Sequence, residues 1–230
     1  MSYRILALGP HPDDLELGCG GMLALAIERD NIVSMATWQP VQEEGGAPQP
    51  YAAERIMEAR RAAELLGAGF LELRDHGPKS VASLVRQLQP HFVLCTWPED
   101  VHPFHQQIGT WCREGIYLAQ LTTANLPYKP WRVAQLLWYQ TYSTLYFHPH
   151  FYIDVTHQYT IAVKALKTHE RGIQILPVLP HAMLVMHLDA GLHAGVAYAE
   201  GFRFECQGWF NNVCERNQLW SLLTMLNAGH

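Results

Sequence analysis

Short apolar runs alternate with longer segments of helical periodicity over the first two thirds of the chain. The apolar runs have the length of buried strands, and they cover residues 3–9, 32–38, 70–73 and 91–97. The segments between and after them predict helices over residues 22–27, 51–66, 80–88 and 106–121, the second ending at Gly67 and the third capped by Ser80. Strands that alternate with helices in this order predict an α/β fold with a doubly wound, mostly parallel sheet.

The last third of the chain is less regular. It contains strand-like runs at residues 133–139 and 151–155, a helical segment at 160–169, and a C-terminal helix at about 214–226. Residues 177–210 mix Pro, His, Gly and aromatic residues without clear periodicity, so no element is assigned to them. Residues 39–50 are rich in Pro and Gly and predict a loop. Because no linker or repeat interrupts the pattern, residues 1–230 are expected to form one Rossmann-like domain.

The composition narrows the class of protein. With 49% hydrophobic and 16% charged residues, the chain is expected to be ordered and globular. A net charge of −5 argues against a nucleic-acid partner. No apolar run is long enough to span a bilayer, and the N-terminus does not resemble a signal peptide. The five cysteines form no CxxC pair, which favours reduced thiols and a cytoplasmic location.

Candidate chemistry gathers where two predicted strands end. His11, Asp13 and Asp14 directly follow the first strand, and His102 and His105 follow the strand at 91–97. In open α/β sheets, ligands collect at the carboxyl ends of the strands. Each motif alone has an ordinary alternative: a polar turn with a capping aspartate, or two surface histidines. Their joint position at one edge of the sheet favours a metal site.

The residue types suggest how such a site would work. A catalytic zinc ion takes about three protein ligands and leaves a position for water. His11, Asp14 and His105 supply two imidazoles and a carboxylate. Asp13 is left as a general base, because adjacent side chains in a turn point in different directions. A bound metal would bring the pKa of its water to roughly 7, within reach of that carboxylate.

These motifs resemble those of the PIG-L/LmbE family of zinc-dependent N-acetylglucosaminyl deacetylases. The resemblance covers most of the chain. It rests on residues 9–21, 55–67, 97–105, 151–156 and 196–202. The last block is especially similar to the bacillithiol-biosynthesis deacetylases, which act on N-acetylglucosaminyl malate.

The resemblance implies a role for individual residues. His11, Asp14 and His105 match the zinc ligands, with another divalent metal such as Fe2+ as an alternative, and Asp13 matches the base. His102 matches a histidine that assists near the leaving group. Tyr198 matches a tyrosine that helps to hold the oxyanion, and Arg55 lies where the family draws a substrate-binding arginine.

Two departures from the family pattern stand out. Phe104 replaces the aspartate of the HPDH motif, which would orient and charge His102. Residues 167–171 read Lys-Thr-His-Glu-Arg where relatives carry a histidine followed by Ser-Gln. The first departure affects the catalytic histidine, and the second affects the substrate rim.

The leading hypothesis is therefore metal-assisted hydrolysis of an N-acetyl group from an N-acetylglucosaminyl conjugate, releasing acetate and a free amino sugar. An amidase acting on another N-acyl sugar or thiol conjugate is one alternative. A catalytically weak protein that binds metal and sugar is another. The family resemblance also suggests a homo-oligomer, with the apolar stretch Met183–Val196 as a candidate subunit contact. Residues 43–46 are a candidate border of the sugar pocket, with a solvated turn as the alternative.

Overall fold

The computed structural model describes residues 2–38, 51–205 and Thr224. The predicted loop at 39–50, with its candidate pocket border at 43–46, lies outside the described residues. So does the predicted C-terminal helix at 214–226, apart from Thr224, which is helical.

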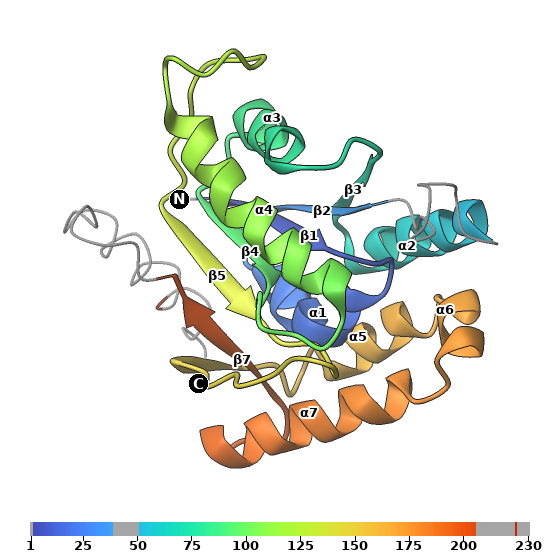
Figure 1. Ribbon diagram of the computed structural model, residues 1–230. Helices are drawn as coiled ribbons and strands as arrows, with labels where there is room; N and C mark the ends of the chain where they lie inside the picture. Colours follow the sequence, from blue (N-terminus) through green and yellow to red (C-terminus); the bar gives the residue numbers. More distant parts are fainter. Residues whose placement is uncertain (1, 39–50, 206–223, 225–230) are drawn as a thin grey trace.

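A seven-stranded mixed sheet forms the centre of the molecule, as Figure 1 shows. In chain order its strands are β1 (Arg4–Gly9), β2 (Ile32–Trp38), β3 (Gly69–Leu73), β4 (Phe92–Thr96), β5 (Gln135–Tyr139), β6 (Phe151–Asp154) and β7 (Ala199–Phe204). Their order across the sheet is β3-β2-β1-β4-β5-β7-β6. The first five are mutually parallel, and β7 runs antiparallel to both β5 and β6. The predicted mostly parallel α/β fold is confirmed.

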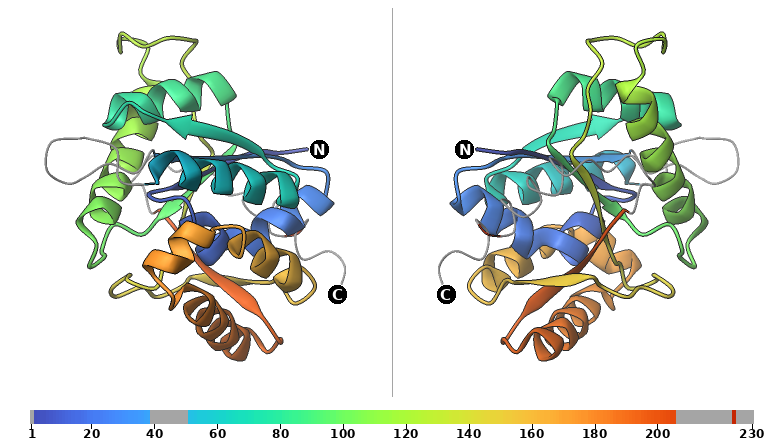
Figure 2. Two further views of the ribbon diagram at one scale, coloured as in Figure 1. Left: turned by 90° about the vertical axis from the view of Figure 1, so that its right-hand side faces the viewer. Right: turned by 90° about the vertical axis from the view of Figure 1, so that its left-hand side faces the viewer.

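Helices cover both faces of the sheet (Figure 2). They are α1 (Asp14–Glu28), α2 (Ala52–Leu66), α3 (Pro78–Leu88), α4 (Pro103–Gln120), α5 (Tyr159–Leu166), α6 (Glu170–Ile175) and α7 (Leu179–Ala194). Apolar residues of α1, α2 and α5 form one core with alternate strand residues such as Ile5 and Ala7. Residues of α3 and α4 form the other core with Leu6 and Leu8. Successive side chains of β1 point to opposite faces of the sheet, so this strand contributes residues to both cores. None of the described helices is long and apolar enough to cross a membrane.

Helix α1 is kinked, and the kink is held from the far end of the sequence. Cys19 has non-helical backbone angles, φ −151° and ψ 15°, and its side chain is buried. The break leaves backbone N–H groups without partners inside the helix. Glu200 of β7 accepts two of them, from Gly21 at 2.7 Å and Met22 at 2.8 Å. The block at 196–202 thus fixes the helix that begins at Asp14.

Several helix boundaries differ from the sequence prediction. Helix α1 begins at Asp14, eight residues before the predicted start at residue 22. Helix α3 begins at Pro78 after Gly77, and the Ser80 hydroxyl donates back to the Gly77 carbonyl (3.1 Å) instead of capping the helix. Helix α4 begins at Pro103, because proline fits the first helical turn, where no N–H partner is needed. The segment at 160–169 is divided into α5 and α6, with His169 directly before α6.

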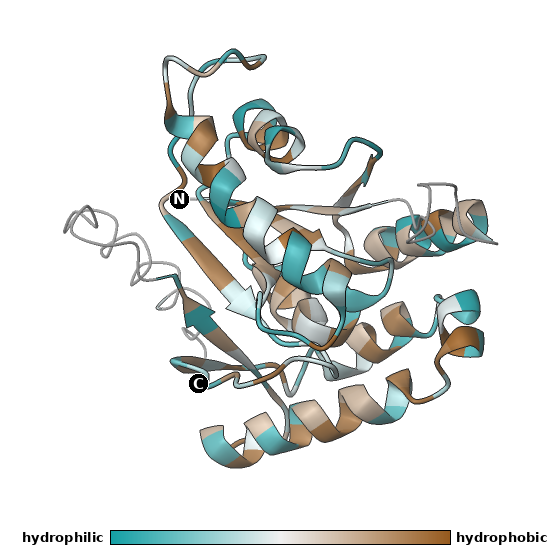
Figure 3. Cartoon of the chain, viewed as in Figure 1, coloured by the Kyte–Doolittle hydropathy of each residue, from teal (hydrophilic) through white to brown (hydrophobic). Residues whose placement is uncertain are grey.

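The largest omission is α7, in the stretch left unassigned. Its apolar residues surround the helix instead of lining one face, so the sequence shows no amphipathic period. Figure 3 shows this apolar character along the helix, which lies at the bottom of the view. Strand β7 was also left unassigned; it is one side of an antiparallel pair with β6.

Candidate active site

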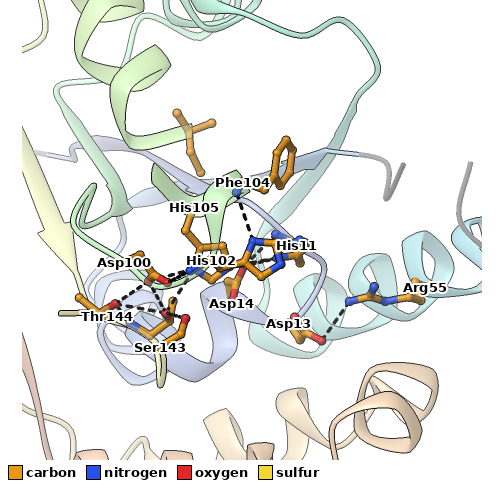
Figure 4. Close-up of polar contacts among 12 residues, drawn as sticks. His11, Asp13, Asp14, Arg55, Asp100, His102, Phe104, His105, Ser143 and Thr144 are labelled. Atoms are coloured by element: carbon orange, nitrogen blue, oxygen red, sulfur yellow. Dashed lines mark hydrogen bonds and ion pairs between the residues drawn. The ribbon is translucent and has the colours of Figure 1, made fainter. Parts of the chain in front are cut away.

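The candidate site lies where the strand order reverses. From β1 the chain passes to β2 on one side, and from β4 it passes to β5 on the other. The loops that follow β1 and β4 therefore separate and leave a crevice at the carboxyl ends of these neighbouring strands. His11 and Asp13 lie in the first connection and Asp14 begins α1. His102 caps α4, and His105 lies in the first turn of that helix. Figure 4 shows these side chains converging.

Three donor atoms meet at this point. His11 Nδ1 lies 3.0 Å from His105 Nε2. Asp14 Oδ2 lies 3.3 Å from the first nitrogen and 3.4 Å from the second. Ligand atoms around a tetrahedral zinc ion are separated by about 3.4 Å when the bonds are 2.0–2.1 Å long. Two imidazole nitrogens facing each other beside a carboxylate also require a proton or a cation between them. The donor set therefore fits a divalent metal.

His105 is oriented for such a role by a second carboxylate. Its Nδ1 lies 3.1 Å from Asp100 Oδ2, so that Nε2 faces His11 and Asp14. Asp100 Oδ2 also accepts hydrogen bonds from the hydroxyls of Thr141 (3.1 Å) and Thr144 (3.0 Å). A carboxylate on the outer nitrogen fixes the tautomer and raises the basicity of a metal-binding imidazole. Asp100 lies within the second matching block, 97–105, but is not among the predicted site residues.

His102 is near the other histidines but differs from them in its hydrogen bonding. His11, His102 and His105 form a cluster whose nitrogens lie within 4.8 Å of one another, so His102 is a rival third ligand. However, His102 Nδ1 accepts the backbone N–H of Phe104 (3.2 Å) as the cap of α4. In the neutral ring Nε2 then carries the proton and is a donor. This hydrogen bonding favours Asp14 as the third ligand and leaves His102 as a hydrogen-bond donor.

Among the described residues, Asp100 does not replace the missing aspartate at the ring of His102. Its Oδ1 accepts the backbone N–H of His102 (2.8 Å), and its Oδ2 faces His105. Burial and the nearby His11 and His105 lower the pKa of His102. The ring of Phe104 packs beside His11, with centroids 5.4 Å apart. His102 is therefore neutral at neutral pH.

Asp13 has the properties of a general base. Its backbone is strained, with φ 141°, and its side chain makes no helix-capping hydrogen bond, so the capping alternative is wrong for this residue. Burial raises the pKa of Asp13 to about 6; Arg55 opposes this shift and Asp14 adds to it. Arg55 Nη2 donates to Asp13 Oδ2 at 3.3 Å. A base with a pKa near neutrality is well matched to proton transfer from water.

A cavity of about 200 Å3 opens over these groups. Six of the seven predicted site residues line it, and the described lining residues are His11, Asp13, Asp14, Arg55, His102, His105, Tyr142, Gly172, Ile175, Leu176 and Leu179. One wall is therefore polar and charged, and the wall from α6 and the start of α7 is apolar. Arg55 is the one arginine or lysine among these lining residues.

Tyr198 is not brought to this cavity. Its half-buried ring stacks on Tyr159, with centroids 3.7 Å apart, on the β6–β7 side of the molecule. The phenol that does line the cavity is that of Tyr142, which follows β5. Tyr142 and Gly172 could not be predicted from the sequence, because single residues in loops and short helices carry no local motif.

The comparisons with known proteins agree with this geometry. Residues 6–115 match the family model described as PIG-L, GlcNAc-PI de-N-acetylase, and this range contains both histidine motifs. The diacetylchitobiose deacetylase of Thermococcus kodakarensis is 25% identical over 92% of this chain and 86% of its own. A conserved protein of Thermus thermophilus has a similar structure, with a TM-score of 0.75 and 28% identity over 87% of this chain and 93% of its own.

An enzyme of a different reaction class has a similar fold. The 4-carboxy-2-hydroxymuconate hydratase of Pseudomonas putida has a TM-score of 0.75 at 18% identity, over 93% of this chain and 100% of its own. This likeness concerns the fold only, because a fold can host unrelated reactions. The family model and the curated relative support a hydrolytic N-deacetylase.

Proposed function

We propose that this chain is a metal-dependent N-deacetylase of the PIG-L/LmbE type that removes the acetyl group from an N-acetylglucosamine conjugate. The observation that carries the proposal is the convergence of His11 Nδ1, Asp14 Oδ2 and His105 Nε2 within 3.4 Å, with Asp13 beside them. The match to a de-N-acetylase family model and the diacetylchitobiose deacetylase relative support the reaction class. Two nitrogens and one carboxylate oxygen suit zinc, which we propose as the metal.

A divalent ion held by these ligands would act as a Lewis acid and make a nearby water molecule easier to deprotonate. Asp13 accepts the proton of the attacking water. Besides Arg55, the described lining residues include two hydrogen-bond donors, the Nε2–H of His102 and the phenol of Tyr142, and these are suited to the developing oxyanion or the leaving amine. One well-placed donor of this kind contributes about 3–4 kcal/mol to the transition state. In this role Tyr142 replaces the Tyr198 expected from the resemblance.

The identity of the group attached to the N-acetylglucosamine is less constrained by the site than the reaction is. N-acetylglucosaminyl malate carries two carboxylates, whereas Arg55 is the single arginine or lysine among the described residues that line the cavity, and it already donates to Asp13. A neutral glycoside such as diacetylchitobiose adds no further negative charge beside Asp13 and Asp14. We therefore propose a neutral N-acetylglucosaminyl glycoside as the better substrate and the malate conjugate as the poorer one.

The first test is release of free amine from both conjugates by the purified protein, with zinc added and with a chelator. Chelator-sensitive release from diacetylchitobiose is the expected result. Faster release from the malate conjugate would leave the reaction in place and overturn the preference for a neutral glycoside. Absence of release from either, by protein holding one zinc ion per chain, would contradict the proposal and favour another acyl substrate or a binding role.

The second test is the substitution Asp13→Asn, which removes the base and keeps its size. Loss of a general base lowers turnover by roughly 10²–10⁴-fold. We expect kcat to fall by this amount while zinc content, measured by atomic absorption, stays at one ion per chain. Asp189→Asn, at an exposed position on α7, is the control and should leave kcat unchanged. Parental turnover by Asp13→Asn would show that Asp13 is not the base.

A further inference from the structure

A second buried acid–base pair lies behind Asp13, and the reaction described above does not use it. Glu16 of α1 is 1% exposed and His169 is fully buried. Glu16 Oε2 lies 3.2 Å from His169 Nε2. Charged groups are rarely buried in this way without a reason.

The pair is poorly satisfied as a purely structural contact. It is close enough for an ion pair, yet within the described part of the chain neither ring nitrogen of His169 makes an aligned hydrogen bond, and neither does Glu16 Oε1. Buried polar atoms without aligned partners destabilise a fold, and in native proteins they call for an explanation such as a functional role.

The protein contains a matched pair that shows the contrast. His187 and Glu200 are also buried and lie 3.0 Å apart. There both ring nitrogens are engaged, because His187 Nδ1 bonds to the Met183 carbonyl (2.9 Å) and Nε2 to Glu200. Glu200 in turn holds the kink of α1. The His187 pair is explained by structure, whereas the His169 pair is not.

Residues 168–172 form a corner that carries His169 and packs against Asp13. A Cβ atom at Gly172, three residues later, would overlap Asp13 Oδ2, so the carboxylate rests directly on the glycine. The corner is fixed to α2 by Glu58, whose two carboxylate oxygens accept the backbone N–H of Arg171 at 3.1 and 3.2 Å. His169 fixes the same corner to α1 through Glu16. Asp13 therefore lies between Arg55 on one side and this corner on the other.

The buried carboxyl groups around His169 also favour a basic residue at this position. Asp13, Asp14, Glu16 and Glu58 bring four buried carboxyl groups together. Burial disfavours the charged imidazole, but Glu16, Asp13 and Glu58 outweigh it and raise the pKa of His169. The neighbouring carboxylates thus favour the protonated ring of His169 behind Asp13, and Arg55 places a positive charge beside Asp13.

We propose that His169 is a positioning residue for Asp13: held by Glu16, it fixes the corner at 168–172 against which the Asp13 carboxylate packs. The inference rests on the proposed role of Asp13 as the base. His169 itself touches neither the metal ligands nor the substrate cavity.

The test compares His169→Gln with His187→Gln. Each substitution removes the imidazole of a buried His–Glu pair and keeps a hydrogen-bond donor. For His169→Gln we expect kcat to fall at least tenfold while KM stays within twofold and one zinc ion remains bound. For His187→Gln we expect a similar decrease in Tm with kcat within twofold of the parent. Equal loss of kcat in both variants, or loss of zinc from His169→Gln, would show a general structural role and overturn the proposal.

A second variant covers the case in which His169→Gln does not fold. Gly172→Ala places a methyl group where the Asp13 carboxylate lies. It should also lower kcat while KM stays within twofold of the parent. Crystal structures of the variants provide a readout that does not depend on turnover. If the parent protein proves inactive on acetylated sugars, the proposed function fails. Displacement of the Asp13 carboxylate from Arg55 in these structures would still support the positioning role, and an unmoved carboxylate would refute it.

Discussion

The protonation of His105 links metal binding to pH at the scale of a single residue. Burial opposes its charged form, but Asp14 and Asp100 raise the pKa of His105 to about 10 in the metal-free protein. The ring is therefore an imidazolium at neutral pH, whereas a metal ligand must be neutral. Because the pKa is raised on folding, the ion pair stabilises the metal-free protein most fully below pH 6.5 and is lost as pH rises through about 10.

We expect zinc to displace this proton when it binds. At pH 7.5 about one proton should be released per zinc ion, and the apparent affinity should rise by roughly tenfold per pH unit between pH 6.5 and 8.5. Isothermal titration calorimetry in buffers of different ionisation enthalpy measures both quantities. Asp100→Asn removes one of the two carboxylates, so it should weaken zinc binding by about 10–100-fold. Zinc binding without proton release would mean that His105 is not a ligand.

The site residues that could be predicted are those that lie together in the sequence. His11, Asp13 and Asp14 adjoin one strand, and His102 and His105 adjoin another, so the strand order alone brings them together. Tyr142 and Gly172 reach the cavity from a loop and a short helix whose positions depend on packing. Tyr198 shows the opposite case, since it matches a sequence block yet packs on Tyr159.

At the scale of elements, the shape of α1 depends on a residue nearly 180 positions away. Glu200 accepts the backbone N–H groups of Gly21 and Met22 and pairs with His187. Glu200→Gln leaves at most one oxygen for these donors and removes the buried charge. We expect it to lower the free energy of unfolding by about 3 kcal/mol, as measured by urea denaturation.

A second glutamate provides the comparison for this experiment. Glu72 pairs with Arg74, whose side chain is largely exposed. Exposed ion pairs contribute at most about 1 kcal/mol, so Glu72→Gln should have little effect. Equal and small effects of both substitutions would show that the kink of α1 does not depend on Glu200.

Elements with a clear period could be predicted from the sequence, and α7 could not. Strand β2 lies at the predicted residues, and α2 ends at Gly67, which adopts the left-handed conformation with φ 86°. Helix α7 has buried residues such as Met183 and also apolar residues that face outward. A helix that is apolar all round has no amphipathic period in its sequence. Its second apolar face becomes visible only in the folded molecule.

At the scale of the whole molecule, that outward face predicts association. Val185, Leu188 and Leu192 lie at i, i+3 and i+7 on α7 and are 65%, 46% and 81% exposed. This spacing places them along one side of the helix. A continuous exposed apolar surface of this kind marks an interaction site. We propose that copies of this chain associate through it, as the family resemblance suggested.

The apolar wall of the cavity lies next to the start of the same helix, which gives association a consequence for activity. Ile175 lines the cavity and is itself 61% exposed, and Leu176 and Leu179 extend the apolar wall to the start of α7. We expect the parent protein to be larger than one chain in size-exclusion chromatography with light scattering. Val185→Asp with Leu192→Asp should yield single chains with a raised KM. Tyr117→Asp, an exposed change on α4 across the sheet, should do neither. Single chains of the parent at every concentration would contradict association through α7, and an unchanged KM in separated chains would show that the cavity is complete within one copy.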